Sequence, residues 1–174
     1  MPYSMSSSSL PVFETAIAAL SAVLDKAAAF AKARNVDPAV LLQSRLAPDM
    51  FPLVRQVQSV TDIAKNGTAR LAGIEAPRYE DNETTIEQLK DRLARTQAWL
   101  KTVDAAKIDG GGGGEVTFPL GPKHHGHMNR GDYLAQFVLP NFYFHLTAAY
   151  AILRHLGVEI GKQDFLGGIP IRIT

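Results

Sequence analysis

The sequence predicts an all-α protein, a four-helix bundle with a small β-hairpin between the third and fourth helices. Four segments carry apolar residues at spacings of three and four, near residues 9–34, 50–72, 83–102 and 130–156. Residues at these spacings share one face of a helix, so each segment can bury one side against the others. A short alternating stretch at residues 115–128 is typical of a hairpin.

The length and composition fit one globular domain. The 174 residues are 46% hydrophobic and 20% charged, and the formal net charge is +1. We therefore expect a single domain over residues 1–174, with residues 1–8 and 168–174 as peripheral tails. Lys and Arg form no block with aromatic residues, which argues against nucleic-acid binding. The chain has no cysteine, which excludes disulfides and a thiol nucleophile and is compatible with the cytoplasm, where we expect this protein.

Signals for export or for membrane insertion are weak. Residues 1–10 lack the basic region of a secretory signal. The segment at residues 133–153 is about long enough to cross a bilayer. It includes polar side chains, however, among them Gln136, Asn141 and His145. A helix in the core of a bundle explains such a segment better than a membrane span does.

Several helix ends carry recognisable signals. Ser7–Ser9 can cap the first helix. Asp37 followed by Pro38 is typical of an N-cap and the first position of a short helix. Gly73 and Gly157 should end two of the long helices, because glycine tolerates the left-handed conformation. Pro140 removes a backbone hydrogen bond inside the last helix and should kink it.

Two long connections, residues 74–81 and 103–128, argue against a simple up-down-up-down chain. The second contains Asp109 followed by five glycines. A phosphate-binding loop would continue with Lys and then Ser or Thr, and Glu115 follows instead, so we interpret this stretch as a linker. Residues 158–174 give no clear pattern.

The residues best suited to chemistry are Asn141 and His145 in the last helix. They lie four residues apart on a stripe that includes Val138 and Ala149, so both should face the bundle interior. An inward histidine with a ligand from a facing helix is how helical bundles build metal centres. Alternatively, the amide and the imidazole bond each other or a backbone carbonyl. Tyr150 is a further candidate for ligand binding, although its spacing from His145 favours core packing.

A second group of histidines, His124, His125 and His127, precedes the last helix. In a strand, His125 and His127 share a face, which is a geometry that can bind a metal. The glycines and prolines around them favour an exposed loop with solvated imidazoles. The role of this group stays open.

Three blocks of sequence resemble a known family. Residues 49–58 (Asp-Met-Phe-Pro-Leu-Val-Arg-Gln-Val-Gln), 140–145 (Pro-Asn-Phe-Tyr-Phe-His) and 161–167 (Gly-Lys-Gln-Asp-Phe-Leu-Gly) carry the resemblance. They look like an uncharacterised bacterial branch of the DinB-like (YfiT-like) superfamily, a branch catalogued as a domain of unknown function. The resemblance runs from about residue 10 to residue 167 and implies a DinB-like four-helix bundle.

The resemblance also bears on metal binding. The superfamily typically holds a divalent metal on one histidine of the second helix and a His-x-x-x-His pair of the fourth. Matching that pattern places Asn141 and His145 at the pair, and Ile63 where close relatives carry a histidine beside Asp62. One imidazole of three remains, and an amide oxygen is a weak ligand for Zn or Ni. Asp62 could substitute, but helical spacing places it away from the apolar stripe, so we expect no tight metal.

Two functional classes follow from these considerations. We expect a bundle that binds a small molecule or another protein, with a decayed metal site and no resident cofactor. The alternative is a metal-dependent transferase or hydrolase acting on a thiol or another small nucleophile. In that case His145 would be a Zn or Ni ligand or a general base, since its ordinary pKa lies near physiological pH. The sequence is also compatible with a homodimer.

Overall fold

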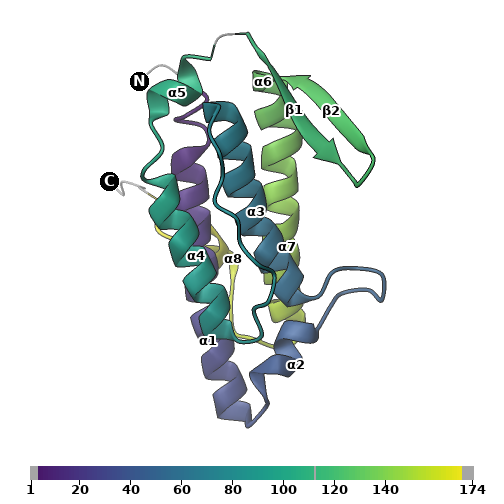
Figure 1. Ribbon diagram of the computed structural model, residues 1–174. Coiled ribbons are helices and arrows are strands. Elements are labelled where there is room, and N and C mark those ends of the chain that lie inside the picture. The colour runs from purple at the N-terminus through teal and green to yellow at the C-terminus, as the bar shows by residue number, and fades with distance from the viewer. Residues whose placement is uncertain (1–3, 112, 170–174) are drawn as a thin grey trace, which may run out of the picture.

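The computed structural model describes residues 4–111 and 113–169 and shows a bundle of four long helices (Figure 1). Packing of their apolar stripes against one another explains why these segments are helical. The four predicted segments are all present, so the expected fold class is confirmed. The long helices are α1 (Leu10–Arg34), α3 (Leu53–Ala72), α4 (Ile86–Leu100) and α7 (Leu139–His155).

The order of the helices in space depends on one long crossover, residues 73–85. In Figure 1, α1 runs downward, α3 and α4 both run upward, and α7 runs downward. The two middle helices are parallel because the crossover returns along α3 before α4 begins. The prediction that the chain is not a simple up-down-up-down bundle is therefore confirmed.

A two-stranded antiparallel hairpin stands beside the start of the last helix (Figure 1). Thr117 pairs with His127, and Pro119 pairs with His125. The expected hairpin is confirmed, whereas two short helices after α4 and α7 were not predicted. The strands are β1 (Glu115–Leu120) and β2 (His124–Asn129), and the short helices are α2 (Pro38–Gln43), α5 (Ala105–Asp109), α6 (Arg130–Asp132) and α8 (Lys162–Leu166).

Most helix ends follow the local sequence signals. The Asp37 carboxylate accepts a hydrogen bond from the Ala39 N–H at 2.9 Å and caps α2. Gly73 and Gly157 end α3 and α7 with φ of 65° and 95°, values that favour glycine. The expected serine cap of α1 is wrong. The hydroxyl of Ser9 donates to the Met5 carbonyl at 2.7 Å, because a helical turn already precedes α1.

The last helix changes its winding before Pro140. A π-helical segment, η1 (Tyr133–Val138), joins α6 to α7, and Pro140 lies in the first turn of α7. The wider π turn accommodates a residue that lacks a backbone N–H, so the expected kink takes this form. The Asn141 side-chain amide donates to the Phe137 carbonyl at 2.7 Å across the same turn.

The glycine-rich connection packs against a buried arginine. A Cβ on Gly111 would lie 2.2 Å from the Arg130 guanidinium carbon, so any larger residue there would displace this guanidinium. The same guanidinium donates to the Ile108 carbonyl at 2.6 Å. Asp109, at the end of α5, accepts hydrogen bonds from the Ser6 N–H and hydroxyl. These contacts attach the connection and the start of the chain to the bundle.

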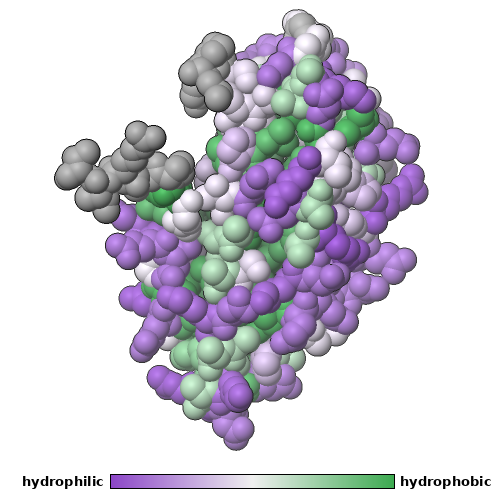
Figure 2. Space-filling view, turned by 90° about the vertical axis from the view of Figure 1, so that its left-hand side faces the viewer, coloured by the Kyte–Doolittle hydropathy of each residue, from purple (hydrophilic) through white to green (hydrophobic). Residues whose placement is uncertain are grey.

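The core lies along α3, which packs against the other long helices. Phe13 of α1 meets Phe142 of α7 edge to face, with ring centroids 4.8 Å apart. Figure 2 shows the side of the molecule formed by α4 and α1, where hydrophilic residues surround smaller apolar patches. An ion pair between Asp91 and Arg95 lies on α4 at 2.9 Å.

Within the described ranges, no helix has the length and hydrophobicity of a membrane span.

Candidate functional site

His145 of α7 is half-buried and is held by Gln56 of α3, with 2.7 Å between Nδ1 and Oε1. Gln56 is itself buried, and its Nε2 donates to the Phe51 carbonyl at 3.1 Å. Because the amide nitrogen donates to that carbonyl, the amide oxygen faces the imidazole. It therefore accepts a hydrogen bond from Nδ1–H. The contacts therefore assign the Nδ1–H tautomer to His145 and leave the lone pair on Nε2.

Two aromatic rings flank this imidazole. Phe51 is stacked, with ring centroids 6.3 Å apart and an interplanar angle of 16°. Phe144 meets it edge to face at 5.1 Å. Both phenylalanines are large exposed apolar side chains, at 49% and 58%. Arg55 lies over the Phe51 ring, 5.6 Å from its centroid. The result is a surface with one imidazole, two accessible rings and one guanidinium.

The surroundings keep His145 uncharged. Burial lowers the pKa of its imidazole, and the positive charge of Arg55 lowers it further. Its ordinary pKa is about 6.5, so a lowered pKa leaves the ring neutral at physiological pH. Nε2 is then an acceptor for a hydrogen bond or a proton.

Asn141, the expected partner, is engaged elsewhere. Its side-chain nitrogen donates to the Phe137 carbonyl at 2.7 Å, and no hydrogen bond joins it to His145 among the described residues. Of the sequence alternatives, the backbone carbonyl is the one realised for Asn141. The idea that Asn141 and His145 satisfy each other is therefore wrong, because each has a nearer partner.

Ile63 lies on the side of α3 that faces α7. Gln56 meets His145 near the start of α3, and a Cβ on Gly67 would lie 2.7 Å from a Val138 methyl further along. Ile63 falls between them in sequence and shares their face of the helix. It is partly buried against the core. The position where the resemblance asks for a histidine is thus filled by an alkyl side chain.

Asp62 points toward α4 and forms part of an ion-pair cluster. The fully buried Arg92 donates to its carboxylate at 2.8 Å, and Lys65 lies 3.1 Å from the same oxygen. The suggested donors Asp62, Asn141 and His145 are therefore not brought together. In the part of the chain that the structure describes, no three His, Cys, Asp or Glu residues are grouped as a metal site.

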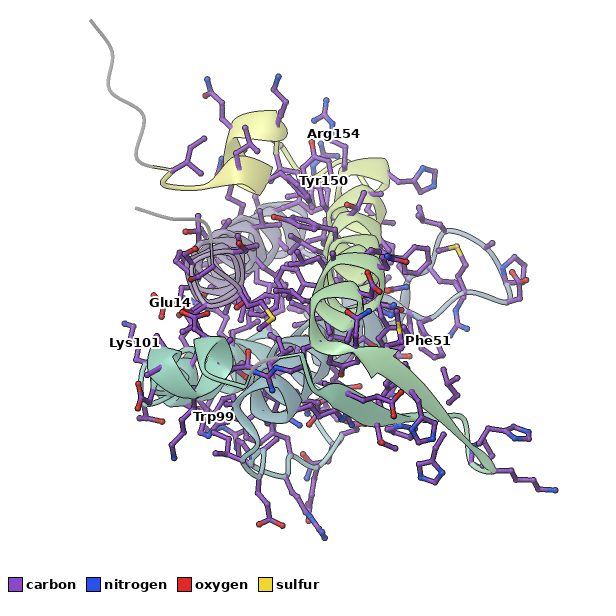
Figure 3. All side chains as sticks on the ribbon, turned by 90° about the horizontal axis from the view of Figure 1, so that it is seen from above. Glu14, Phe51, Trp99, Lys101, Tyr150 and Arg154 are labelled. Carbon is purple, nitrogen blue, oxygen red and sulfur yellow. The ribbon has the colours of Figure 1, made fainter. Side chains whose placement is uncertain are left out.

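Tyr150 lies on another side of α7. Its ring packs against Phe165 of α8, with centroids 5.6 Å apart. It also lines a small apolar cavity with Leu20 and Leu146. Figure 3 shows Tyr150 beside α8 and Phe51 on the opposite side of α7. The structure thus separates Tyr150 from His145 and gives it the core-packing position that its spacing favoured.

The hairpin histidines are exposed, as the surrounding glycines and prolines indicated. His127 Nδ1 lies 3.1 Å from the Thr117 hydroxyl and 3.5 Å from a carboxylate oxygen of Glu115. His125 shares the face of His127, opposite Pro119 in the strand register. These contacts are local to the hairpin.

Sequence reasoning missed Gln56, Phe51 and Arg55 as neighbours of His145. Gln56 is next to the apolar stripe residue Val57, so periodicity drew attention away from it. The available signal was the block at residues 49–58, which contains all three and carries part of the family resemblance.

Comparisons with known proteins agree with that resemblance. The family model described as domain of unknown function (DUF1993) matches residues 5–166. A crystal structure of a DinB family member protein from Shewanella denitrificans is 39% identical, with a TM-score of 0.88. The match covers 95% of this chain and 93% of that chain. A comparison with curated proteins found no match.

Proposed function

Because the chain belongs to the DUF1993 family and shares the fold of a DinB family member, we propose that it is a binding protein whose ligand contacts His145. The observation that supports this proposal is the neutral imidazole. Gln56 orients it through Nδ1, and its Nε2 lone pair has no hydrogen-bond partner among the described residues.

The neighbours of His145 define the class of ligand. Phe51 and Phe144 offer exposed rings on which a planar molecule can stack. Nε2 accepts a hydrogen bond, so the ligand should carry an O–H or N–H donor. Arg55 lies over the Phe51 ring, and its guanidinium is also paired with Asp81 at 2.5 Å. A small aromatic molecule with a hydroxyl group satisfies the ring contacts and the hydrogen bond to Nε2, and a negative group on it would share Arg55 with Asp81.

The side chains at this position do not fit a tight Zn or Ni centre. Such metals prefer several imidazole or thiolate ligands. Here the amide oxygen of Gln56 already accepts the proton of His145, and the Asn141 amide is bound to a carbonyl. The facing position on α3 is Ile63, so a single imidazole remains. We therefore propose no metal step for this protein.

A second candidate function is general-base catalysis by His145 on a small molecule. The lowered pKa favours it, because a base must be unprotonated at the working pH. The bond to Gln56 holds the imidazole in the tautomer that can accept a proton at Nε2. Binding without turnover supports the first function, and turnover that disappears in His145→Gln supports the second.

NMR titration with 4-hydroxybenzoate tests the binding function, because this probe supplies a ring, a hydroxyl and a carboxylate. We expect the Nε2 resonance of His145 to shift on titration and binding to be lost in His145→Phe. His155→Phe is the matched control, since His155 is an exposed residue in the last turn of the same helix. Equal binding by wild type and His145→Phe would contradict the proposal.

A further inference from the structure

A separate cavity of about 820 Å³ lies between the second half of α3 and residues 74–79. These residues begin the crossover that runs along α3 to α4 in Figure 1. The volume falls within the range of small-molecule sites, which is roughly 300–1,000 Å³. Asn66 and Ala69 of α3 line the cavity, whereas Gln56 and Gly67 lie on the face of α3 toward α7. The cavity is therefore on a different face of α3 from the site at His145.

The charged side chains that line the cavity are mostly cationic. Lys65, Arg70 and Arg78 contribute three positive charges, and Asp62 and Glu75 contribute two negative charges. The Asp62 carboxylate is already bound by Lys65 and by the buried Arg92 behind the cavity. It is therefore not free to neutralise either of the two lining arginines.

Arg70 and Arg78 have no carboxylate within ion-pair distance among the described residues. The Arg70 guanidinium donates instead to the Tyr133 hydroxyl at 3.1 Å. Tyr133 is buried in η1, so this bond fixes one guanidinium without neutralising it. A guanidinium held in this way presents its remaining N–H groups to an incoming acceptor.

The far wall of the cavity is also held in place by cations. The Lys65 ammonium and the Arg92 guanidinium each lie 5.2 Å from the centroid of the Tyr79 ring. Arg95 lies 4.8 Å from the same centroid. Cation–π contacts of this kind fix Tyr79, and with it the crossover segment, against α3 and α4. The contact of Arg70 with Tyr133 and the contacts of Tyr79 with three cations therefore hold the two walls of the cavity.

We propose that this cavity binds a small anionic molecule through a phosphate or carboxylate group held by Arg70 and Arg78. Guanidinium groups suit both anions because their parallel N–H groups match two acceptor oxygens. Lys65, which is 5% exposed, lies at the α3 side, and its charge is paired with Asp62. This inference does not depend on the proposed function, because the two sites share no residue.

Titration at low ionic strength tests the site, with inorganic phosphate in one arm and malonate in the other. We expect amide resonances of Lys65 and Asn66 to shift with at least one probe. A response to phosphate alone indicates a phosphorylated ligand, and a response to malonate alone indicates a carboxylate. Arg70→Gln and Arg78→Gln should each weaken binding by about tenfold, which corresponds to the loss of one good charged contact.

Arg154→Gln is the matched control, because Arg154 is an exposed arginine near the end of α7 (Figure 3). It removes the same charge outside the cavity and should leave the affinity unchanged. Equal weakening by this control, or no shift with either probe, overturns the proposal. Arg78→Gln alone guards against misfolding, since Arg78 is exposed and makes no ion pair among the described residues. His145→Phe should keep the anion affinity, which separates this site from the one at His145.

Discussion

The buried amide of Gln56 fixes the proton of His145 on Nδ1. Its oxygen lies 2.7 Å from that nitrogen, while its own nitrogen donates to the Phe51 carbonyl at 3.1 Å. The oxygen and nitrogen of a Gln amide could exchange places by a flip of the side chain. The carbonyl of Phe51 can only accept a hydrogen bond, so the nitrogen of Gln56 must face it. The relationship therefore sets which imidazole nitrogen faces a ligand.

Gln56→Leu should destabilise the fold by about 1–3 kcal/mol, because it leaves the Nδ1–H of His145 and the carbonyl of Phe51 without partners. A double-mutant cycle of Gln56→Leu with His145→Phe should show coupling, since the two side chains bond each other. Urea unfolding measures both quantities. In contrast, Asn141→Leu with His145→Phe should be nearly additive. Strong coupling in that second cycle would contradict the contacts described here.

Stability should fall as the pH drops below about 6.5, and His145 should contribute to the fall. The unfolded chain takes up a proton at the ordinary pKa, whereas the lowered pKa of the folded state delays that uptake. Stability is therefore lost from about pH 6.5 downward until the folded pKa is passed. Urea melts between pH 7.5 and pH 5 should show a smaller slope for His145→Gln than for wild type.

His155→Gln is the control for that measurement, because His155 is an exposed residue of the same helix. It shows how much the slope changes when any imidazole is removed from this helix. The pKa values of Asp81 and Asp164 are also lowered. The causes there are hydrogen bonds and the positive charges of arginine at Asp81 and of lysine at Asp164. These carboxylates lose their contribution only at more acidic pH, below their ordinary range. If the stability of His145→Gln changed with pH as steeply as that of wild type, the pKa of His145 in the wild-type protein would not be lowered.

Removal of divalent metal should leave the melting temperature unchanged. A metal that binds only the folded state stabilises it by mass action, and the side chains around His145 do not fit such a site. The informative comparison is Ile63→His combined with Asn141→His, which supplies the three imidazoles of the superfamily pattern. Zinc should raise the melting temperature of this variant and not that of wild type. A chelator-induced drop in wild type, absent in His145→Ala, would refute the expectation.

Arg92→Met should cost about 3–5 kcal/mol, because removal of one partner strands buried charges. Arg92 is fully buried and contacts the carboxylates of Asp62 and Glu83 and the hydroxyl of Thr61. The control is Arg95→Met on the same helix, whose side chain is 51% exposed and pairs with Asp91. Exposed pairs contribute roughly 0–1 kcal/mol. If both variants lost a similar free energy of unfolding, the buried contacts of Arg92 would contribute no more than an exposed ion pair.

Local features could be predicted from the sequence. The apolar spacing located the four long helices, the signals at Gly73 and Gly157 located two of their ends, and Asp37 located the start of the short helix α2. Each of these depends on residues a few positions apart along the chain, so periodicity and backbone preference are sufficient. The same reasoning placed His145 on α7, but it offered Asn141 as a partner where the structure has Gln56. The two short helices α5 and α8 were missed because five residues give too little periodicity to recognise.

Tertiary structure decided which partner each polar side chain found. Gln56 and His145 are 89 residues apart, and Arg92 reaches Asp62 across 30 residues. Helical phase indicates the face on which a residue lies, but it does not say which of several facing side chains comes within hydrogen-bond distance. That choice depends on the register between helices, which packing along their whole length sets. The donor–acceptor distance of a hydrogen bond varies by only a few tenths of an ångström. The contact between Gln56 and His145 therefore depends on how α3 and α7 pack together.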